Sequence, residues 1–249
     1  MSDSCVITNE DGDVKRGCNS DVIRCKFAVM NPERTFTLPP YQTACGAVDI
    51  MMHTMERYFS PDTDMALTDN LAEALLRTVK ECAYIVLADG KDYNARAQIM
   101  WASSLAHNGL TGCGMRSDFG THRLEHELSA LFDVAHGAGL AALWGSWARY
   151  VLDTDPGRFV KFAVNVMGVE NDPSDPRATA LKGIQAMEGF YHDIGMPTSI
   201  RELLSRDITA EEIEIMADKC SRNSTITVGC FKKLRREDMV KIYSMASGS

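Results

Sequence analysis

Several features that would assign a class at once are missing from this 249-residue sequence. It has no C-x-x-C pair, and its eight cysteines are scattered, which argues against a zinc ribbon or a disulfide framework. No apolar run approaches the roughly 18 residues of a membrane span, and the acidic, polar first residues are not those of a signal peptide. A net charge of −8 argues against a nucleic-acid partner. We therefore expect a cytoplasmic protein with free thiols.

What is present is an ordinary globular composition, 45% hydrophobic and 24% charged, with helical patterning. From Thr43 onward, apolar residues recur at intervals of three and four, the period of an α-helix. Ser199 and Thr209, each followed three residues later by glutamate, indicate capping boxes at two helix starts. The predicted fold class is therefore mainly α. The predicted helices cover residues 66–87, 92–106, 118–131, 137–152, 157–167, 177–194 and 236–246.

The first 36 residues or so have a different character. Residues 5–8 and 25–30 are rich in β-branched or aromatic side chains and are predicted strands, and residues 9–13 are a predicted turn. Pro39 and Pro40 mark a boundary, because proline biases the preceding residue away from helix.

Four of the six histidines fall in two short segments that are predicted to be helical. Asp49 and His53 are one turn apart on one helix face, so they can present an oxygen and a nitrogen to the same point. His122 and His136 would lie roughly 21 Å apart in one straight helix, so the chain must turn between them, near residues 132–135. A divalent transition metal accepts such a mixture of ligands. The predicted metal ligands are Asp49, His53, His122 and His136, from three helices.

The remaining polar residues near these segments have weaker signals. His126 lies one turn after His122 and is open to three interpretations: a ligand, a core histidine or a catalytic group. His107 is expected to line a pocket or to support the site, and His192 to lie on the surface. Glu125 and Glu127 are expected to face solvent.

A competing interpretation belongs to another class of enzyme. Residues His122, Glu125 and His126 match H-x-x-E-H, the inverzincin peptidase pattern, in which both histidines bind zinc and the glutamate activates water. With three fixed positions, this pattern arises often by chance. A metal-binding helical bundle without catalysis is a further alternative.

A family resemblance rests on the same residues. D-x-x-x-H at Asp49–His53, H-x-x-x-H-x-L at His122, His126 and Leu128, and H-G at His136 resemble the iron-containing (group III) alcohol dehydrogenases, in particular their butanol-dehydrogenase branch. The surrounding stretches YQTACGAVDI, AQIMWASSLAHN, HELSALFDVAHGAGLA and RFVKFAVNVMGV agree as well. The resemblance extends from about Ser4 to the C-terminus.

The resemblance implies a dehydroquinate synthase-like fold in two parts. Residues 39–249 would be the all-helical metal-binding catalytic domain, and residues 1–38 a short β remnant of the N-terminal α/β cofactor domain. The G-G-G-S loop that grips the cofactor pyrophosphate in this family does not occur in the sequence. The glycine-containing runs 109–114 and 136–140 do not follow a predicted strand. Met1 is therefore expected to be an internal methionine of a longer enzyme.

The resemblance also implies an activity. The intact enzyme would reversibly reduce a small aldehyde to a primary alcohol, with NAD(P)H as hydride donor and Fe²⁺, Zn²⁺ or another divalent metal as Lewis acid. His126 would face the nicotinamide, as a cofactor-binding and catalytic residue that helps to relay a proton. The missing cofactor domain would be a partner, and the chain alone is expected to be inactive. Apolar surface exposed by the missing domain would favour self-association.

Overall fold

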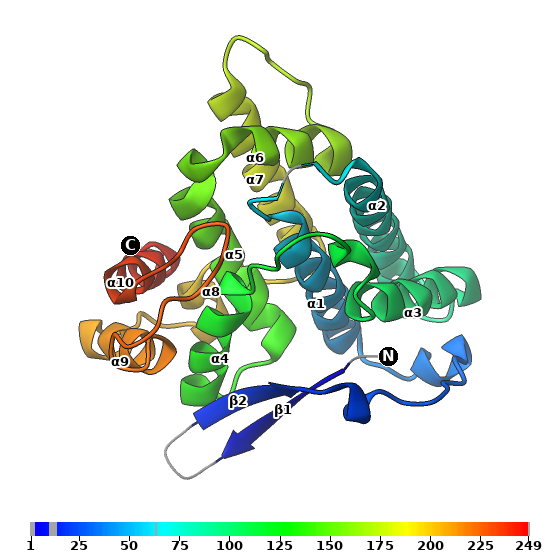
Figure 1. Ribbon diagram of the computed structural model, residues 1–249. Coiled ribbons are helices and arrows are strands. Elements are labelled where there is room, and N and C mark those ends of the chain that lie inside the picture. Colours follow the sequence, from blue (N-terminus) through cyan, green and yellow to red (C-terminus); the bar gives the residue numbers. More distant parts are fainter. Residues whose placement is uncertain (1–2, 10–13, 63, 249) are drawn as a thin grey trace.

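The computed structural model describes residues 3–9, 14–62 and 64–248, and over these ranges the fold is mainly α, as the periodicity predicts (Figure 1). Short 3₁₀ helices occur at Asp21–Ile23, Pro32–Thr35, Leu110–Gly112 and Leu152–Thr154. Among the described helices, none is both long and apolar enough to cross a membrane. All eight cysteines are free thiols, as predicted. The strands are β1 (Ser4–Asn9) and β2 (Val14–Asn19), and the helices are α1 (Pro40–Tyr58), α2 (Ala66–Ala88), α3 (Tyr93–His107), α4 (Gly120–Phe132), α5 (His136–Val151), α6 (Pro156–Phe162), α7 (Pro176–Asp193), α8 (Ile200–Leu204), α9 (Ala210–Cys220) and α10 (Arg236–Ala246).

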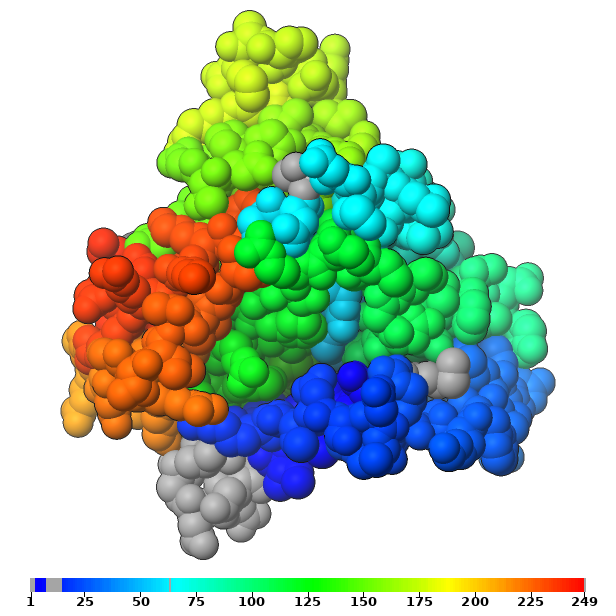
Figure 2. Space-filling view, in the orientation of Figure 1, coloured from blue at the N-terminus to red at the C-terminus, as the bar shows by residue number. Residues whose placement is uncertain are grey.

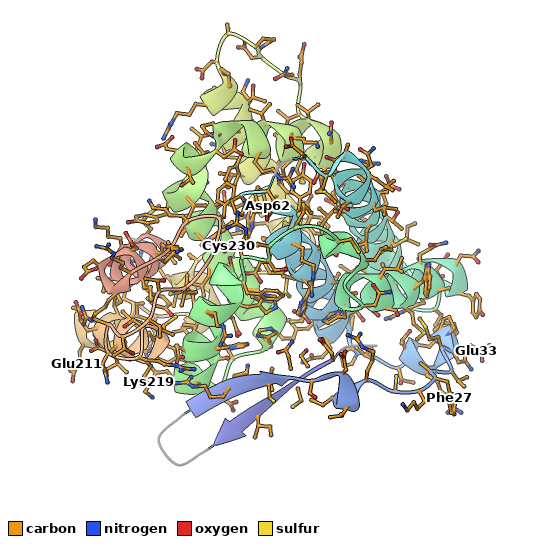
Figure 3. The ribbon with its side chains drawn as sticks, in the orientation of Figure 1. Phe27, Glu33, Asp62, Glu211, Lys219 and Cys230 are labelled. Carbon is orange, nitrogen blue, oxygen red and sulfur yellow. The ribbon has the colours of Figure 1, made fainter. Side chains whose placement is uncertain are left out.

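The N-terminal hairpin confirms one predicted strand and corrects the other. β1 covers residues 5–8, but its antiparallel partner is β2, with Cys5 opposite Cys18. Residues 25–30 form no strand, because no neighbouring strand offers them hydrogen bonds; Phe27 is 79% exposed and lies at the edge of the molecule (Figure 3). In the predicted turn at 9–13, residues 10–13 fall outside the described part of the chain. The assignment of residues 1–38 to a separate domain stays a prediction.

Helix starts follow the predicted capping chemistry with one difference. Thr209 and Glu212 form a complete capping box at α9. At α8, Ser199 accepts the backbone N–H of Glu202, but the Glu202 carboxylate accepts the N–H of Thr198 rather than that of Ser199. The predicted helix 157–167 begins as α6 and continues as a π-helix over Ala163–Met167.

α5 is the centre of the helical body and packs against α1, α4, α7, α8 and α10. Its side chains are apolar almost all round, which is typical of a helix buried on every side. Trp144 and Trp147 of α5 are at most 1% exposed. Phe59 stacks on Phe159 with ring centroids 4.5 Å apart. This aromatic core holds α5 against the end of α1, which fixes the two helices that carry three of the four predicted ligands, Asp49, His53 and His136.

A buried ion pair fixes the end of α1 to α2 and α6. The Arg158 guanidinium donates to both carboxylate oxygens of Asp69 at 2.6 and 2.7 Å and to the backbone carbonyl of Tyr58 at 2.6 Å. Both ionic side chains are at most 3% exposed. Removal of one partner from such a pair typically costs about 3–5 kcal/mol, because the other charge stays buried.

Candidate metal centre

Local structure brings the predicted ligands together as the sequence requires. Asp49 and His53 lie on one face of α1, which begins with Pro40 at its first turn, where proline costs no hydrogen bond. α4 ends at Phe132, Asp133 has a left-handed backbone with φ 50°, and α5 begins at His136. The predicted turn between His122 and His136 is thus confirmed, and their ring centroids are 5.2 Å apart.

Asp49 is the centre of the cluster. Its Oδ1 lies 3.5 Å from Nε2 of His53, 3.4 Å from Nε2 of His122 and 3.6 Å from Nε2 of His136. Asp49 belongs to two separate groups of three residues. Within each group, the donor atoms lie within 4.8 Å of one another. One contains His122 and His136, and the other contains His53 and His107.

Two buried carboxylates orient the histidines from behind. Glu56 accepts a hydrogen bond from Nδ1 of His122 and another, at 3.0 Å, from the backbone N–H of the same residue. Glu125 accepts from Nδ1 of His136. Both glutamates are at most 1% exposed. Because an ionised carboxylate only accepts, the proton of each neutral ring stays on Nδ1, and the Nε2 lone pair is directed at Asp49. This carboxylate–histidine arrangement is the one that orients metal-bound imidazoles.

Asp49 Oδ1 and His122 Nε2 face each other at 3.4 Å. Asp49 Oδ1 and His122 Nε2 are both buried and have no hydrogen-bond partner among the described residues. Burial opposes a charge on His122, but Glu56 and Asp49 outweigh it and raise the pKa of this imidazole to about 10. Burial and the charge of His122 lower the pKa of His53 to about 2. Either a proton or a metal ion between Asp49 and His122 would satisfy both atoms, and the oxygen and nitrogen donors fit a divalent transition metal, which would compete with the proton on His122.

Comparison with known proteins assigns the chain to a family. Residues 43–247 match the model of the "Fe-containing alcohol dehydrogenase family, C-terminal". The chain belongs to this family. It is 39% identical over 244 residues to NADH-dependent butanol dehydrogenase A of Clostridium acetobutylicum, which covers 98% of this chain and 62% of the relative. It is also 34% identical over 197 residues to an NADPH-dependent aldehyde reductase of Escherichia coli, which covers 79% and 50% of the two chains.

The fold agrees with a crystal structure in the same family. NADH-dependent butanol dehydrogenase A of Thermotoga maritima matches with a TM-score of 0.92 and 33% sequence identity. The match covers 99% of this chain and 62% of that one. The chain thus spans about three fifths of the length of this relative, and its helical body is that of an iron-type alcohol dehydrogenase, as the resemblance predicts.

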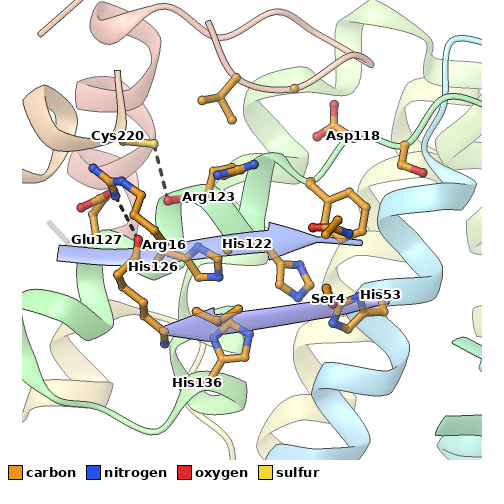
Figure 4. Close-up of a pocket in the computed structure, with 18 of the residues that line it drawn as sticks. Ser4, Arg16, His53, Asp118, His122, Arg123, His126, Glu127, His136 and Cys220 are labelled. Atoms are coloured by element: carbon orange, nitrogen blue, oxygen red, sulfur yellow. Dashed lines mark hydrogen bonds and ion pairs between the residues drawn. The ribbon is translucent and has the colours of Figure 1, made fainter. Parts of the chain in front are cut away.

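Two predictions about side chains of α4 are wrong. Glu125 and Glu127 do not face solvent: their exposure is 0% and 4%. α4 is covered by α5, α9 and the hairpin, so little of its surface is free. Glu127 pairs with Arg16 of β2 at 3.1 Å (Figure 4).

Sequence reasoning also missed Glu56, although a signal was present. Glu56 follows His53 by three residues, and Glu125 follows His122 by three, so each lies on the same helix face as a predicted ligand. In the structure, Glu125 bonds His136 and is fully buried, so it is not placed to activate a water in the cavity, as the H-x-x-E-H interpretation requires.

The other histidines divide between the cavity and the surface. The ring centroids of His126 and His136 are 5.7 Å apart. Burial lowers the pKa of His126 to about 3. His107 lines the cavity, which confirms the prediction for it, and burial lowers its pKa as well. The side chain of His192 is 56% exposed, which confirms a surface position.

The histidines line a cavity of about 810 Å³ between the helices and the hairpin. Figure 4 shows the rings of His53, His122, His126 and His136 beside the two strands. In Figure 2 the blue N-terminal segment lies against the green helices. Nζ of Lys15 in this segment donates a hydrogen bond to Oγ of Ser129 in α4 at 2.8 Å. The volume suits a cofactor-sized ligand. The basic residues that line the cavity are Lys15, Arg16, Arg57, Arg123, Lys219 and Arg222.

Proposed function

We propose that this chain is the metal-binding half of an NAD(P)H-dependent enzyme that interconverts small aldehydes and primary alcohols. The observation that carries the proposal is the convergence of three imidazole nitrogens on Asp49 Oδ1, within a chain of the iron-containing alcohol dehydrogenase family. Two relatives, a butanol dehydrogenase and an aldehyde reductase, support the substrate class.

Asp49, His53, His122 and His136 are the proposed ligands of a divalent ion. Fe²⁺ is favoured by the family description, although oxygen and nitrogen donors suit Zn²⁺, Mn²⁺ and Ni²⁺ as well. When bound, the ion would supply Lewis-acid chemistry for a carbonyl oxygen. The glutamates behind the cluster hold the rings of His122 and His136 in the orientation that binding requires.

His126 is proposed as the residue that faces the nicotinamide and handles the proton. Its ring lines the cavity beside the metal cluster, and its lowered pKa keeps the imidazole neutral near pH 7. A neutral imidazole offers one nitrogen that accepts a proton and one that donates a hydrogen bond. His126 can therefore accept a hydrogen bond from an alcohol hydroxyl in the cavity and help to relay its proton, without binding the ion.

The nicotinamide nucleotide needs a binding site that this sequence supplies only in part. The cavity offers volume and is lined by six Lys and Arg side chains beside four carboxylates, but the sequence has no G-G-G-S loop. We infer that an N-terminal cofactor domain completes the site, with residues 1–38, which include strands β1 and β2, as its last part. In the chain without this domain, the surface that the domain would cover is exposed. We propose that two or more copies associate through it.

Elemental analysis of the purified chain tests the metal site. We expect about one divalent ion per chain, lost in His53→Ala and in His136→Ala because each removes a nitrogen beside Asp49. His192→Ala is the matched control, since its exposed ring is bonded to Thr198 and Glu202 outside the cavity. Full metal content in both cluster variants would contradict the proposed site.

A further inference from the structure

Another imidazole lies within reach of the proposed ion, although no sequence motif indicates it. His107 is the last residue of α3 and lines the same cavity. Its ring packs against that of His53, with centroids 3.8 Å apart and planes inclined at 49°. One nitrogen of His107 lies within 4.8 Å of donor atoms of both Asp49 and His53. α3 therefore adds a fourth helix to the three that the sequence predicts.

The hydrogen bonding of His107 leaves one ring nitrogen with a lone pair. Nδ1 lies 2.9 Å from the backbone carbonyl oxygen of Ser103. Because a carbonyl only accepts, Nδ1 of the neutral ring carries the proton, and Nε2 keeps its lone pair. Backbone carbonyls, like carboxylates, are the partners that orient metal-bound histidines. Ser103 thus does for His107 what the buried glutamates do for His122 and His136.

On these grounds we propose that His107 is a further ligand of the divalent ion, which rests on the proposed metal site at Asp49. Two nitrogens on one first-row ion lie up to roughly 4.2 Å apart, twice a metal–nitrogen distance of about 2.1 Å. The donor atoms of Asp49, His53 and His107 lie within 4.8 Å of one another, so they would need to close by at most about 0.6 Å to share one ion.

The additional nitrogen has a consequence for metal choice. The proposed ion would then take imidazoles from both groups of donors that share Asp49. Imidazole suits Zn²⁺, Cu²⁺, Fe²⁺ and Ni²⁺, whereas Mg²⁺ and Ca²⁺ prefer carboxylate, carbonyl and water oxygens. The site is therefore expected to exclude the hard cations and to bind Co²⁺, a convenient spectroscopic probe.

The test compares metal affinity in matched variants of the 249-residue chain. Zn²⁺ and Co²⁺ affinities are measured by competition with a chelator for the wild type, His107→Leu and the control His192→Leu. We expect His107→Leu to lower the affinity at least about tenfold and to change the visible absorption spectrum of the Co²⁺ form, which depends on the number of ligands. The control should leave both unchanged. Unchanged affinity and spectrum in His107→Leu would overturn the inference.

A second variant separates lost ligation from lost folding. In His107→Ala, added imidazole should enter the half-buried position beside the cavity and restore both the affinity and the Co²⁺ spectrum. A folded His107→Ala chain, judged by its circular dichroism, that imidazole fails to restore would count against ligation. The inference and the proposed function fail in different ways: a wild-type chain that binds no ion refutes the metal site, whereas a normal site without any effect at His107 refutes only the inference.

Discussion

The crossing of α1 and α5 at Gly137 gives a sharp test of how the metal cluster is positioned. A Cβ added at Gly137 would lie 2.2 Å from the backbone oxygen of Cys45 and 2.6 Å from its Cα. Ordinary contact begins at 3.4 Å, and the atoms in the way are backbone, so the helices must separate by about 1 Å. His136 precedes Gly137, and Asp49 is one turn after Cys45, so the same movement separates two proposed ligands.

The magnitude of the effect of Gly137→Ala follows from two opposing terms. Overpacking costs about 1–3 kcal/mol, and alanine returns up to about 1 kcal/mol through its helix propensity. The net loss is therefore about 0–3 kcal/mol, and since each kcal/mol corresponds to about 2–4 °C in Tm for a chain of this size, we expect the Tm of the apo-protein to fall by up to about 12 °C. Metal affinity should fall at least about tenfold, since ligand distances are tolerated only within about 0.2 Å.

Gly46→Ala is the matched control for this substitution. Gly46 is also helical and is adjacent to Cys45, but a Cβ there meets nothing within 4 Å. Its replacement should stabilise the protein by up to about 1 kcal/mol and leave metal affinity unchanged. Calorimetric unfolding and chelator competition measure both variants. If Gly137→Ala has the Tm and the affinity of the wild type, the close crossing does not position the cluster and the reasoning is refuted.

Three further predictions address the proposed function. His126→Ala should keep nearly full metal content by elemental analysis, because the residue lies beside the cluster; a loss as large as in His122→Ala would support the peptidase interpretation instead. Glu125→Gln should lower metal affinity by about 10–100-fold, whereas Glu127→Gln, whose carboxylate contacts Arg16 rather than a histidine, should not; equal losses would show that charge alone matters. The 249-residue chain should reduce butanal with NADH or NADPH only negligibly, because hydride transfer needs reacting atoms held about 3–3.5 Å apart. Activity should appear when an N-terminal cofactor domain is added. Ready turnover by the chain alone would refute this prediction.

The helices could be predicted because their signals are local. The apolar period defines each helix within its own residues, and the turn at Asp133 follows from the need to bring His122 and His136 together. The strand at 14–19 could not be predicted in the same way. Its sequence, VKRGCN, is polar and lacks alternation, and it is ordered by pairing with β1 and by the contacts of Lys15 and Arg16 with α4.

The supporting residues of the site were hidden for a related reason. A glutamate beside a histidine in a helical sequence is normally a solvated residue, and only the packing around α4 shows that Glu125 is enclosed. His107 belongs to a helix far along the chain from the D-x-x-x-H motif, so only the tertiary structure brings it to His53. Ligand spacing within a motif can be predicted from sequence, whereas the partners that orient the ligands depend on which helices meet.

The distribution of the cluster over distant segments also sets an order of assembly. In an unfolded chain only Asp49 and His53 are close enough to hold an ion together, and closure of the long loop to His136 carries an entropic cost that grows with its length. Docking of α1, α4 and α5 through their apolar faces must therefore come first, and the ion enters a cluster that the core has already formed. Chelation should consequently yield a folded apo-protein that can be reloaded, and metal supply should govern the amount of loaded protein rather than the rate at which the chain folds.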